Sequence, residues 1–216
     1  MKVSTLFAGA ALAATLAATQ VHATPLPIVG GTTAVTLTSA ATLTSLGIGV
    51  APLGSATISP GSSGTPIAYF GITGGKLDTD SFAGMILHDG SGLSLSSGPA
   101  VIDLSNFVID TTALLVSGDV AIGTTQLNDV GLLDVSLTGN PFTPFSLKLT
   151  AAAAGALETV FGISGLTGAE LGVANTLPIT AAVPEPATYL SFMAGLGLLG
   201  VALRRRRSAL LPSGAA

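Results

Sequence analysis

Acidic residues and one histidine are the groups in the middle of the chain that could do chemistry. Asp78 and Asp80 are two residues apart and Asp89 follows them, and calcium favours several carboxylate and carbonyl oxygens gathered by a flexible loop. The segment lacks the glycine and the terminal glutamate of an EF-hand loop. We therefore treat Asp78, Asp80 and Asp89 as candidate metal ligands, and favour turn capping through side-chain to backbone hydrogen bonds for Asp78 and Asp80.

A catalytic set is harder to assemble from these residues. His88 next to Asp89 is the one pairing of an imidazole with a carboxylate, but successive residues of a strand point to opposite faces. We expect His88 to lie on the surface or in a turn, and we predict no catalytic residues, no enzymatic activity and no cofactor. The chain has no cysteine, which excludes disulfides, thiolate zinc sites and cysteine nucleophiles.

The charge balance narrows the choice of partners. Residues 24–183 hold two lysines and no arginine against ten carboxylates, a net charge of −8. Binding to nucleic acid requires clustered Lys and Arg, so a nucleic-acid ligand is excluded. An acidic exterior of low charge density suits a secreted protein.

Alternation of apolar and small polar residues at period two predicts strands in this region. The segments that show it are 35–38, 93–96, 102–104, 107–109, 133–137 and 145–149. Turns are expected at 60–64, 74–75, 89–92, 97–99, 117–119 and 139–141, where Gly, Pro, Asp, Asn and Ser gather. Short strands at this spacing predict a mainly β, sandwich-like or two-layer ectodomain.

One short helix is expected from Ala151 to Phe161, where alanine dominates and alternation stops. We expect it to cap one open end of the sheets. Residues 24–63 are rich in Thr, Ser and Gly and form either an N-terminal arm or extra strands. The β-rich ectodomain is predicted at 64–175, followed by a stalk at 176–183.

The first 23 residues form a secretory signal peptide: Lys2 precedes an Ala- and Leu-rich run, and Val21-His22-Ala23 has the small residues that signal peptidase reads. Cleavage between Ala23 and Thr24 would remove His22 and leave His88 as the only imidazole of the mature chain. An uncleaved N-terminal membrane anchor is the alternative.

A second apolar segment lies near the C-terminus. Residues 187–203 are uncharged and would give a transmembrane helix of about 25 Å, just long enough to span a membrane. Arg204, Arg205, Arg206 and Arg207 follow, so the positive-inside rule places residues 208–216 in the cytoplasm as a tail and the ectodomain outside. A plain membrane anchor is one interpretation of this segment.

The order of the parts at this end supports a more specific interpretation. Pro184, Glu185 and Pro186, followed by a glycine-rich span and an arginine cluster, resemble the PEP-CTERM sorting signal of exported Gram-negative proteins. The resemblance covers residues 184–207. It implies that an exosortase, a membrane cysteine transpeptidase, recognises Pro184, Glu185 and Pro186 and cuts near them.

The middle of the chain also resembles, more distantly, HtaA-like β-domains of exported bacterial proteins. The segments that resemble them are 75–78, 88–93 and 106–110. Some such domains bind haem through a tyrosine, but no ligand motif aligns with Tyr69. The resemblance implies a β-fold.

These observations predict an exported, exosortase-processed protein of the cell envelope or extracellular matrix, without catalytic activity. It would be membrane-anchored before processing and lie at the cell surface or outside the cell afterwards. Its expected partners are signal peptidase, exosortase, the membrane and extracellular polysaccharide. The alternative is a ligand-binding secreted β-domain, for calcium or haem, or an enzymatic one.

Overall fold

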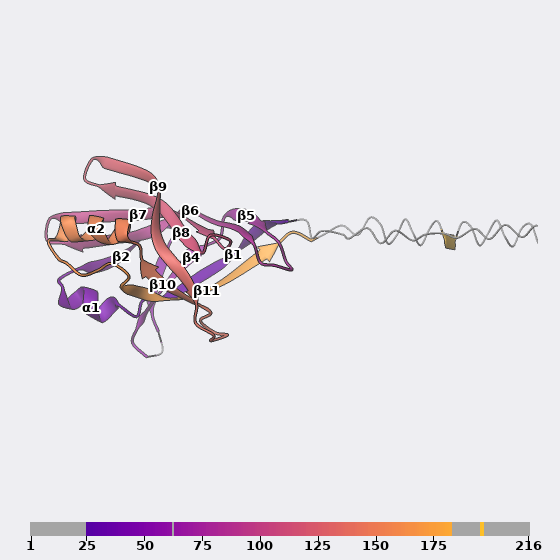
Figure 1. Cartoon of the computed structure of the whole chain (residues 1–216), viewed down its shortest axis with the longest axis horizontal. Coiled ribbons are helices and arrows are strands. Elements are labelled where there is room, and N and C mark those ends of the chain that lie inside the picture. The colour runs from indigo at the N-terminus through magenta and orange to yellow at the C-terminus, as the bar shows by residue number, and fades with distance from the viewer. Residues whose placement is uncertain (1–24, 62, 183–194, 197–216) are drawn as a thin grey trace, which may run out of the picture.

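A computed structural model describes residues 25–61, 63–182 and 195–196 of the chain, and Figure 1 shows its arrangement. Eleven strands form one antiparallel sheet, and two helices accompany it in the described part of the chain. The elements are β1 (Leu26–Thr36), α1 (Ala40–Ser45), β2 (Gly49–Gly54), β3 (Thr57–Pro60), β4 (Pro66–Gly71), β5 (Gly74–Leu77), β6 (Gly84–Ser97), β7 (Ala100–Asp110), β8 (Leu115–Ile122), β9 (Thr125–Leu137), β10 (Phe145–Leu149), α2 (Ala151–Phe161) and β11 (Glu170–Thr180).

The sheet closes on itself because its first and last strands pair. β1 pairs with β11 from Ile28 opposite Thr180 to Thr36 opposite Val173, and its other edge pairs with β5 and β4. Following the neighbours from β11 through β10, β9, β8, β7, β6 and β5 leads back to β1. The prediction of a mainly β domain is confirmed, but the expected two layers are one continuous closed sheet, which leaves these strands without a long free edge.

Alternation along the strands directs apolar side chains to the inside of this closed sheet. Leu93 and Leu95 on β6 lie opposite Leu104 and Ile102 on β7, and all but Leu104 are buried. Ser94, their neighbour on the same strand, is half-buried and lies on the other face, as period two requires. The apolar residues of the strands therefore line one shared interior.

Helix α2 has the predicted bounds and lies over one end of the sheet. It begins at an N-cap, Thr150, whose side-chain oxygen accepts a hydrogen bond from the backbone N–H of Ala153, and it ends at Gly162 in the left-handed conformation. Ala154 and Leu157 are buried, and the helix packs against β9 and β7. In Figure 1, α2 lies at the left, opposite the start of β1 and the end of β11.

Helix α1 was not predicted, because the Thr- and Ser-rich segment from residue 35 to 46 repeats a strand-like pattern. Residues 25–61 form extra strands together with this short helix, and the first of those strands, β1, belongs to the closed sheet. The segment is therefore not a loose arm.

Three of the predicted turns belong to strands in the structure. Residues 74–75 begin β5, residues 89–92 form an irregularity within β6, and residues 117–119 form one within β8. Glycine in a strand can mark a bulge as well as a turn, and here it allows close backbone approach, because a Cβ on Gly92 would overlap the Leu104 carbonyl oxygen. The turns at 97–99 and 139–141 do connect strands, as predicted.

The predicted stalk also differs from what the structure has. Residues 176–180 belong to β11, where Thr176 and Leu177 pair with Thr33 and Thr32 of β1. The last strand of the closed sheet thus continues to within a few residues of the predicted sorting signal.

No helix in the described part of the chain is long and apolar enough to cross a membrane. The signal peptide with Ala23 and Thr24, the motif Pro184, Glu185 and Pro186, and the arginines from Arg204 to Arg207 lie outside the described residues. So does the predicted helix 187–203, apart from Gly195 and Leu196.

Candidate functional site: an apolar cavity inside the closed sheet

The interior of the closed sheet holds a cavity of about 1360 Å³. Its lining runs from α1 and α2 at one end to the other end, where it includes Thr79, Ser81, Phe82, Asp110, Thr111, Leu114 and residues 176–180. Protein interiors normally contain few voids larger than a water molecule, and pockets for small ligands measure about 300–1,000 Å³. This cavity is therefore a binding-site candidate for a large apolar molecule.

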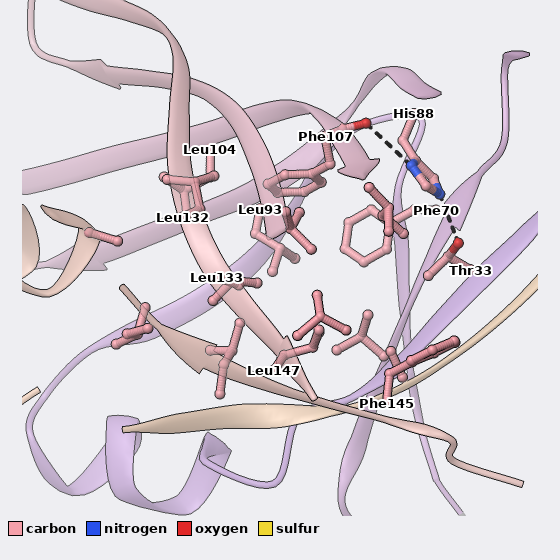
Figure 2. Close-up of a pocket in the computed structure, with 18 of the residues that line it drawn as sticks. Thr33, Phe70, His88, Leu93, Leu104, Phe107, Leu132, Leu133, Phe145 and Leu147 are labelled. Atoms are coloured by element: carbon pink, nitrogen blue, oxygen red, sulfur yellow. Dashed lines mark hydrogen bonds between the residues drawn. The ribbon is translucent and has the colours of Figure 1, made fainter. Parts of the chain in front are cut away.

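Apolar side chains from many strands make up most of the wall, as Figure 2 shows. The labelled apolar residues come from β4, β6, β7, β9 and β10: Phe70, Leu93, Leu104, Phe107, Leu132, Leu133, Phe145 and Leu147. Leu93 on β6 and Leu147 on β10 contribute through alternating inward-facing positions of their strands. Leu132 and Leu133 are consecutive, and both line the wall where the pairing of β9 with β8 shifts register.

His88 is the titratable side chain deep in this wall. It is only 1% exposed, which makes the expectation of a surface or turn histidine wrong. Its Nδ1 lies 3.3 Å from the Phe107 carbonyl oxygen and its Nε2 lies 2.7 Å from Thr33 Oγ1. Because a carbonyl oxygen only accepts, Nδ1–H donates to Phe107, and Nε2 of the neutral ring accepts from the Thr33 hydroxyl.

Two further contacts hold this polar group in place. Thr33 Oγ1 lies 3.2 Å from Thr176 Oγ1, so the group joins β6, β1 and β11 at the seam that closes the sheet. The Phe70 ring meets both His88 and Phe107 edge to face, with centroids 6.5 and 5.4 Å apart. The dashed lines in Figure 2 mark the His88 bonds.

Burial lowers the pKa of His88 below its ordinary value of 6.5, because the surrounding side chains exclude the water that would solvate a charged ring. The hydrogen bond to Phe107 and the charge of Asp89 oppose this effect. The imidazole in the wall is therefore neutral at pH 7.

No buried side-chain nitrogen or oxygen among the described residues lacks a hydrogen-bond partner. Both ring nitrogens of His88 are engaged, so neither is available to a metal or an axial ligand without breaking a hydrogen bond. A ligand in the cavity would meet almost entirely apolar atoms, and any polar group it buried there would cost free energy.

The three candidate metal ligands do not form one site. Within residues 25–61 and 63–182, no group of three or more His, Asp or Glu side chains could hold a metal ion. Asp78 Oδ1 accepts hydrogen bonds from the backbone N–H groups of Asp80 and Ser81, so the turn-capping interpretation of Asp78 is confirmed. Asp89 is exposed on the outer face, opposite to its neighbour His88.

Tyr69 also lies away from the site. It is on β4, where it pairs with Ala34 and Thr57, and it is not among the residues that line the cavity.

The uncovered end of the cavity has two turns of the same design. Asp78 caps the turn that ends at Phe82, and Asp110 caps the next, accepting from the N–H groups of Thr112 and Ala113 before Leu114. Phe82 and Leu114 are the fifth residues of these turns, line the cavity and have positive φ values of 58° and 54°. They are 65% and 46% exposed, so they stand at its mouth.

Several of these residues were missed from the sequence alone. His88 was expected on the surface or in a turn, although the alternation of Ile86 and His88 was the signal for an inward position. The two turns share the pattern Asp-Thr-x-x-apolar, at 78–82 and 110–114, and that repeat could have identified the mouth.

The described part of the chain is thus a closed antiparallel sheet around an apolar cavity, covered by a helix at one end. Residues 182–207 match the PEP-CTERM protein-sorting motif, which confirms the resemblance found in the sequence. That motif belongs to exported proteins that exosortase processes from a membrane-anchored precursor.

No curated protein matches the chain. Among solved structures, the C-terminal domain of HtaA from Corynebacterium glutamicum is similar, with 14% identity and a TM-score of 0.47. The match covers 69% of this chain and 95% of that one. At this level the likeness supports no inference about a ligand.

Proposed function

We propose that the protein is an exported, exosortase-processed envelope protein that binds an uncharged, apolar ligand inside its closed sheet and has no catalytic activity. Signal peptidase and exosortase would be its processing enzymes, and the mature chain would work at the cell surface or outside the cell.

The cavity is the observation that supports a binding role. A void in a core costs about 24 cal/mol per Å³ when side chains are removed to create it. A cavity of 1360 Å³ is therefore a feature that packing alone would eliminate. Because the buried polar side chains are already partnered, the wall favours a ligand that makes few hydrogen bonds.

The other candidate functions receive less support from the geometry. A hydroxyl hydrogen-bonded to an imidazole resembles the nucleophile and general base of a catalytic triad. In such a triad a carboxylate orients the imidazole, whereas the group that orients His88 is a backbone carbonyl. Calcium lacks a ligand cluster among the described residues. The polysaccharide partner stays a prediction, because an apolar interior does not match a sugar chain.

Binding can be measured with residues 24–182, which contain every strand of the closed sheet. We expect the neutral fluorophore N-phenyl-1-naphthylamine to brighten on addition of this protein and to be displaced by a long-chain alcohol. Ala174→Phe, which fills the cavity from β11, should weaken binding of the probe by at least tenfold.

The matched control is Ala121→Phe, which adds the same side chain to a half-buried position of β8 that does not line the cavity. If Ala174→Phe and Ala121→Phe bound the probe equally, the interior would not be the site. No probe binding by the unaltered protein would refute the binding function.

Sorting is tested separately in cells with and without exosortase. We expect the precursor to shorten at or near Pro184, Glu185 and Pro186 only when exosortase is present, and Glu185→Ala to reduce that shortening. Intact mass spectrometry of the envelope and medium fractions gives both mature ends. A chain of identical mass and location in both strains would refute processing.

A further inference from the structure

The open end of the closed sheet differs from the helix-covered end in how much apolar surface it exposes. Large apolar side chains are exposed at eleven positions within residues 25–182. Eight of these positions lie toward the open end of the closed sheet, and three do not. The eight are Val29, Phe82, Met85, Leu114, Leu137, Phe142, Leu177 and Ile179.

We propose that this open end docks on the surface of a lipid bilayer, with Phe82, Leu114 and Leu137 entering the apolar layer around the mouth of the cavity. This inference rests on the proposed function in one respect: docking would let the apolar ligand pass between the bilayer and the cavity without crossing water.

The three rim residues are exposed and line the cavity at the same time. Leu137 ends β9 opposite Phe145 and is 75% exposed, although its position on the strand faces inward. Phe82 and Leu114 project from the two aspartate-capped turns. A contiguous apolar patch around a cavity mouth is typical of a surface that meets an apolar partner.

Backbone conformation at the rim supports a role for these side chains. A bulky residue with positive φ is uncommon and strained, whereas Gly or Asn adopts that conformation readily. Phe82 and Leu114 both adopt it, and hydrogen bonds fix them there: Thr111 Oγ1 donates to the Phe82 carbonyl and the Val135 N–H donates to the Leu114 carbonyl. Phenylalanine and leucine at these positions contradict local preference, which suggests that their apolar surface is needed.

The position of the chain ends favours a bilayer as the partner. The structure describes the chain up to residue 182 at the open end, where the sorting motif begins, and Figure 1 shows the start of β1 and the end of β11 together there. From Thr180 to Ala187, the start of the uncharged segment, the chain can extend at most about 25 Å. In the precursor the open end is therefore held close to the membrane.

Charge around the rim predicts which bilayer is preferred. Asp78, Asp80 and Asp110 lie in the two turns, and Lys76 is the nearby cation. Anionic lipid would repel this set, so the contact must depend on apolar insertion instead of electrostatic attraction. We expect binding to phosphatidylcholine vesicles to exceed binding to vesicles that contain phosphatidylglycerol, and to persist at high salt.

Vesicle co-sedimentation of residues 24–182 tests the proposal. The triple variant Phe82→Asn, Leu114→Asn, Leu137→Ser should reduce partitioning into phosphatidylcholine vesicles by at least tenfold. Asparagine relieves the strained φ at the first two positions, so the variant should remain folded, which its thermal melt will verify. The matched control is Leu46→Ser with Leu127→Ser, which removes exposed cavity-lining leucines away from the open end and should partition like the unaltered protein.

Tryptophan fluorescence gives an independent measurement, because the chain contains no tryptophan. The fluorescence emission of the Phe82→Trp variant should shift to the blue when vesicles are added and should be quenched by brominated lipid. The emission of the Leu127→Trp variant should show neither change. A failure of the unaltered protein to bind, equal loss in rim and control variants, or binding that requires phosphatidylglycerol would each overturn the proposal.

A second copy of the chain is the other occupant that the rim could accept. In that case light scattering would show a dimer that the triple variant dissociates, with no partitioning into vesicles, and bilayer docking would be refuted. The naphthylamine assay is read separately: probe binding without vesicle binding refutes docking alone, whereas loss of probe binding refutes the proposed function.

Discussion

The two ends of the closed sheet use similar apolar residues for opposite purposes. At one end Leu157 of α2 is 7% exposed and packs into the core, while at the other end Leu114 is 46% exposed at the tip of a turn. The first end is finished by a capped helix and the second by two aspartate-capped turns. The covered end therefore buries its apolar side chain in the core, whereas the open end leaves its apolar surface available for a partner.

The largest expected effect contrasts an aspartate at each end. Leu157→Asp would bury an unpaired carboxylate among apolar side chains and should lower the free energy of unfolding by about 4 kcal/mol or more. Leu114→Asp should change it by less than about 0.5 kcal/mol, because the site is largely exposed and Asp tolerates positive φ. Urea titration of both variants measures the contrast. Equal losses would show that the open end is as tightly packed as the covered one.

His88 lies between these two ends of the closed sheet, and its replacement should give the next largest loss of stability. His88→Phe would leave the Phe107 carbonyl without its side-chain partner and Thr33 with only Thr176, at a cost of about 1–3 kcal/mol. Urea titration at pH 7.5 measures this loss, and Ser94→Ala, on the outer face of the same strand, is the control. An unchanged midpoint would mean that the polar group contributes nothing to closing the sheet.

The same residue predicts a dependence of stability on pH. Burial lowers the pKa of His88 in the folded state, so below pH 6.5 the unfolded chain binds the proton that the folded chain does not. The free energy of unfolding should therefore fall as pH drops from about 6.5, until the pH is below the folded-state pKa of His88. Titrations at pH 7.5 and 5.0 on the unaltered protein and on His88→Phe isolate this contribution, since the carboxylates are common to both. A parallel decline in the two proteins would contradict the prediction.

How far the sequence predicted this structure depends on whether the determinant was local. Local patterns sufficed for α2, whose alanine-rich run and Thr150 cap set its bounds, and for β10, where alternation matched the strand at 145–149. The closure of the sheet was not predicted, because it depends on β1 pairing with β11 more than 130 residues later. No local propensity encodes that pairing.

The site was less predictable than the fold for a related reason. His88 and Thr33 are 55 residues apart in sequence, and their contact follows only once β1, β5 and β6 are aligned. The bulge between His88 and Gly92 has the composition of a turn, and only the continuous pairing of β6 with β7 on both sides identifies it as part of a strand.

A moderate effect is expected at the N-cap of the covering helix. Thr150→Ala would remove the hydrogen bonds of its hydroxyl with the Ala153 N–H and the Gly131 carbonyl, and should cost about 1–2 kcal/mol. Thr150→Ser should retain most of that stability and serves as the control. Thermal melts of the two variants check this, and equal melting temperatures would mean that the helix does not depend on its cap.

The smallest expected effect has the opposite sign and lies at the open end. Leu114→Asn should leave the free energy of unfolding unchanged or raise it by up to about 1 kcal/mol, because Asn adopts the positive φ of 54° that strains leucine and little buried surface is lost. Leu115→Asn, one residue further along and half-buried in β8, is the control and should destabilise the protein. A clear loss of stability in Leu114→Asn would show that Leu114 packs into the core like Leu157. In that case the contrast between the two ends would disappear, and the apolar rim would need no partner to explain it.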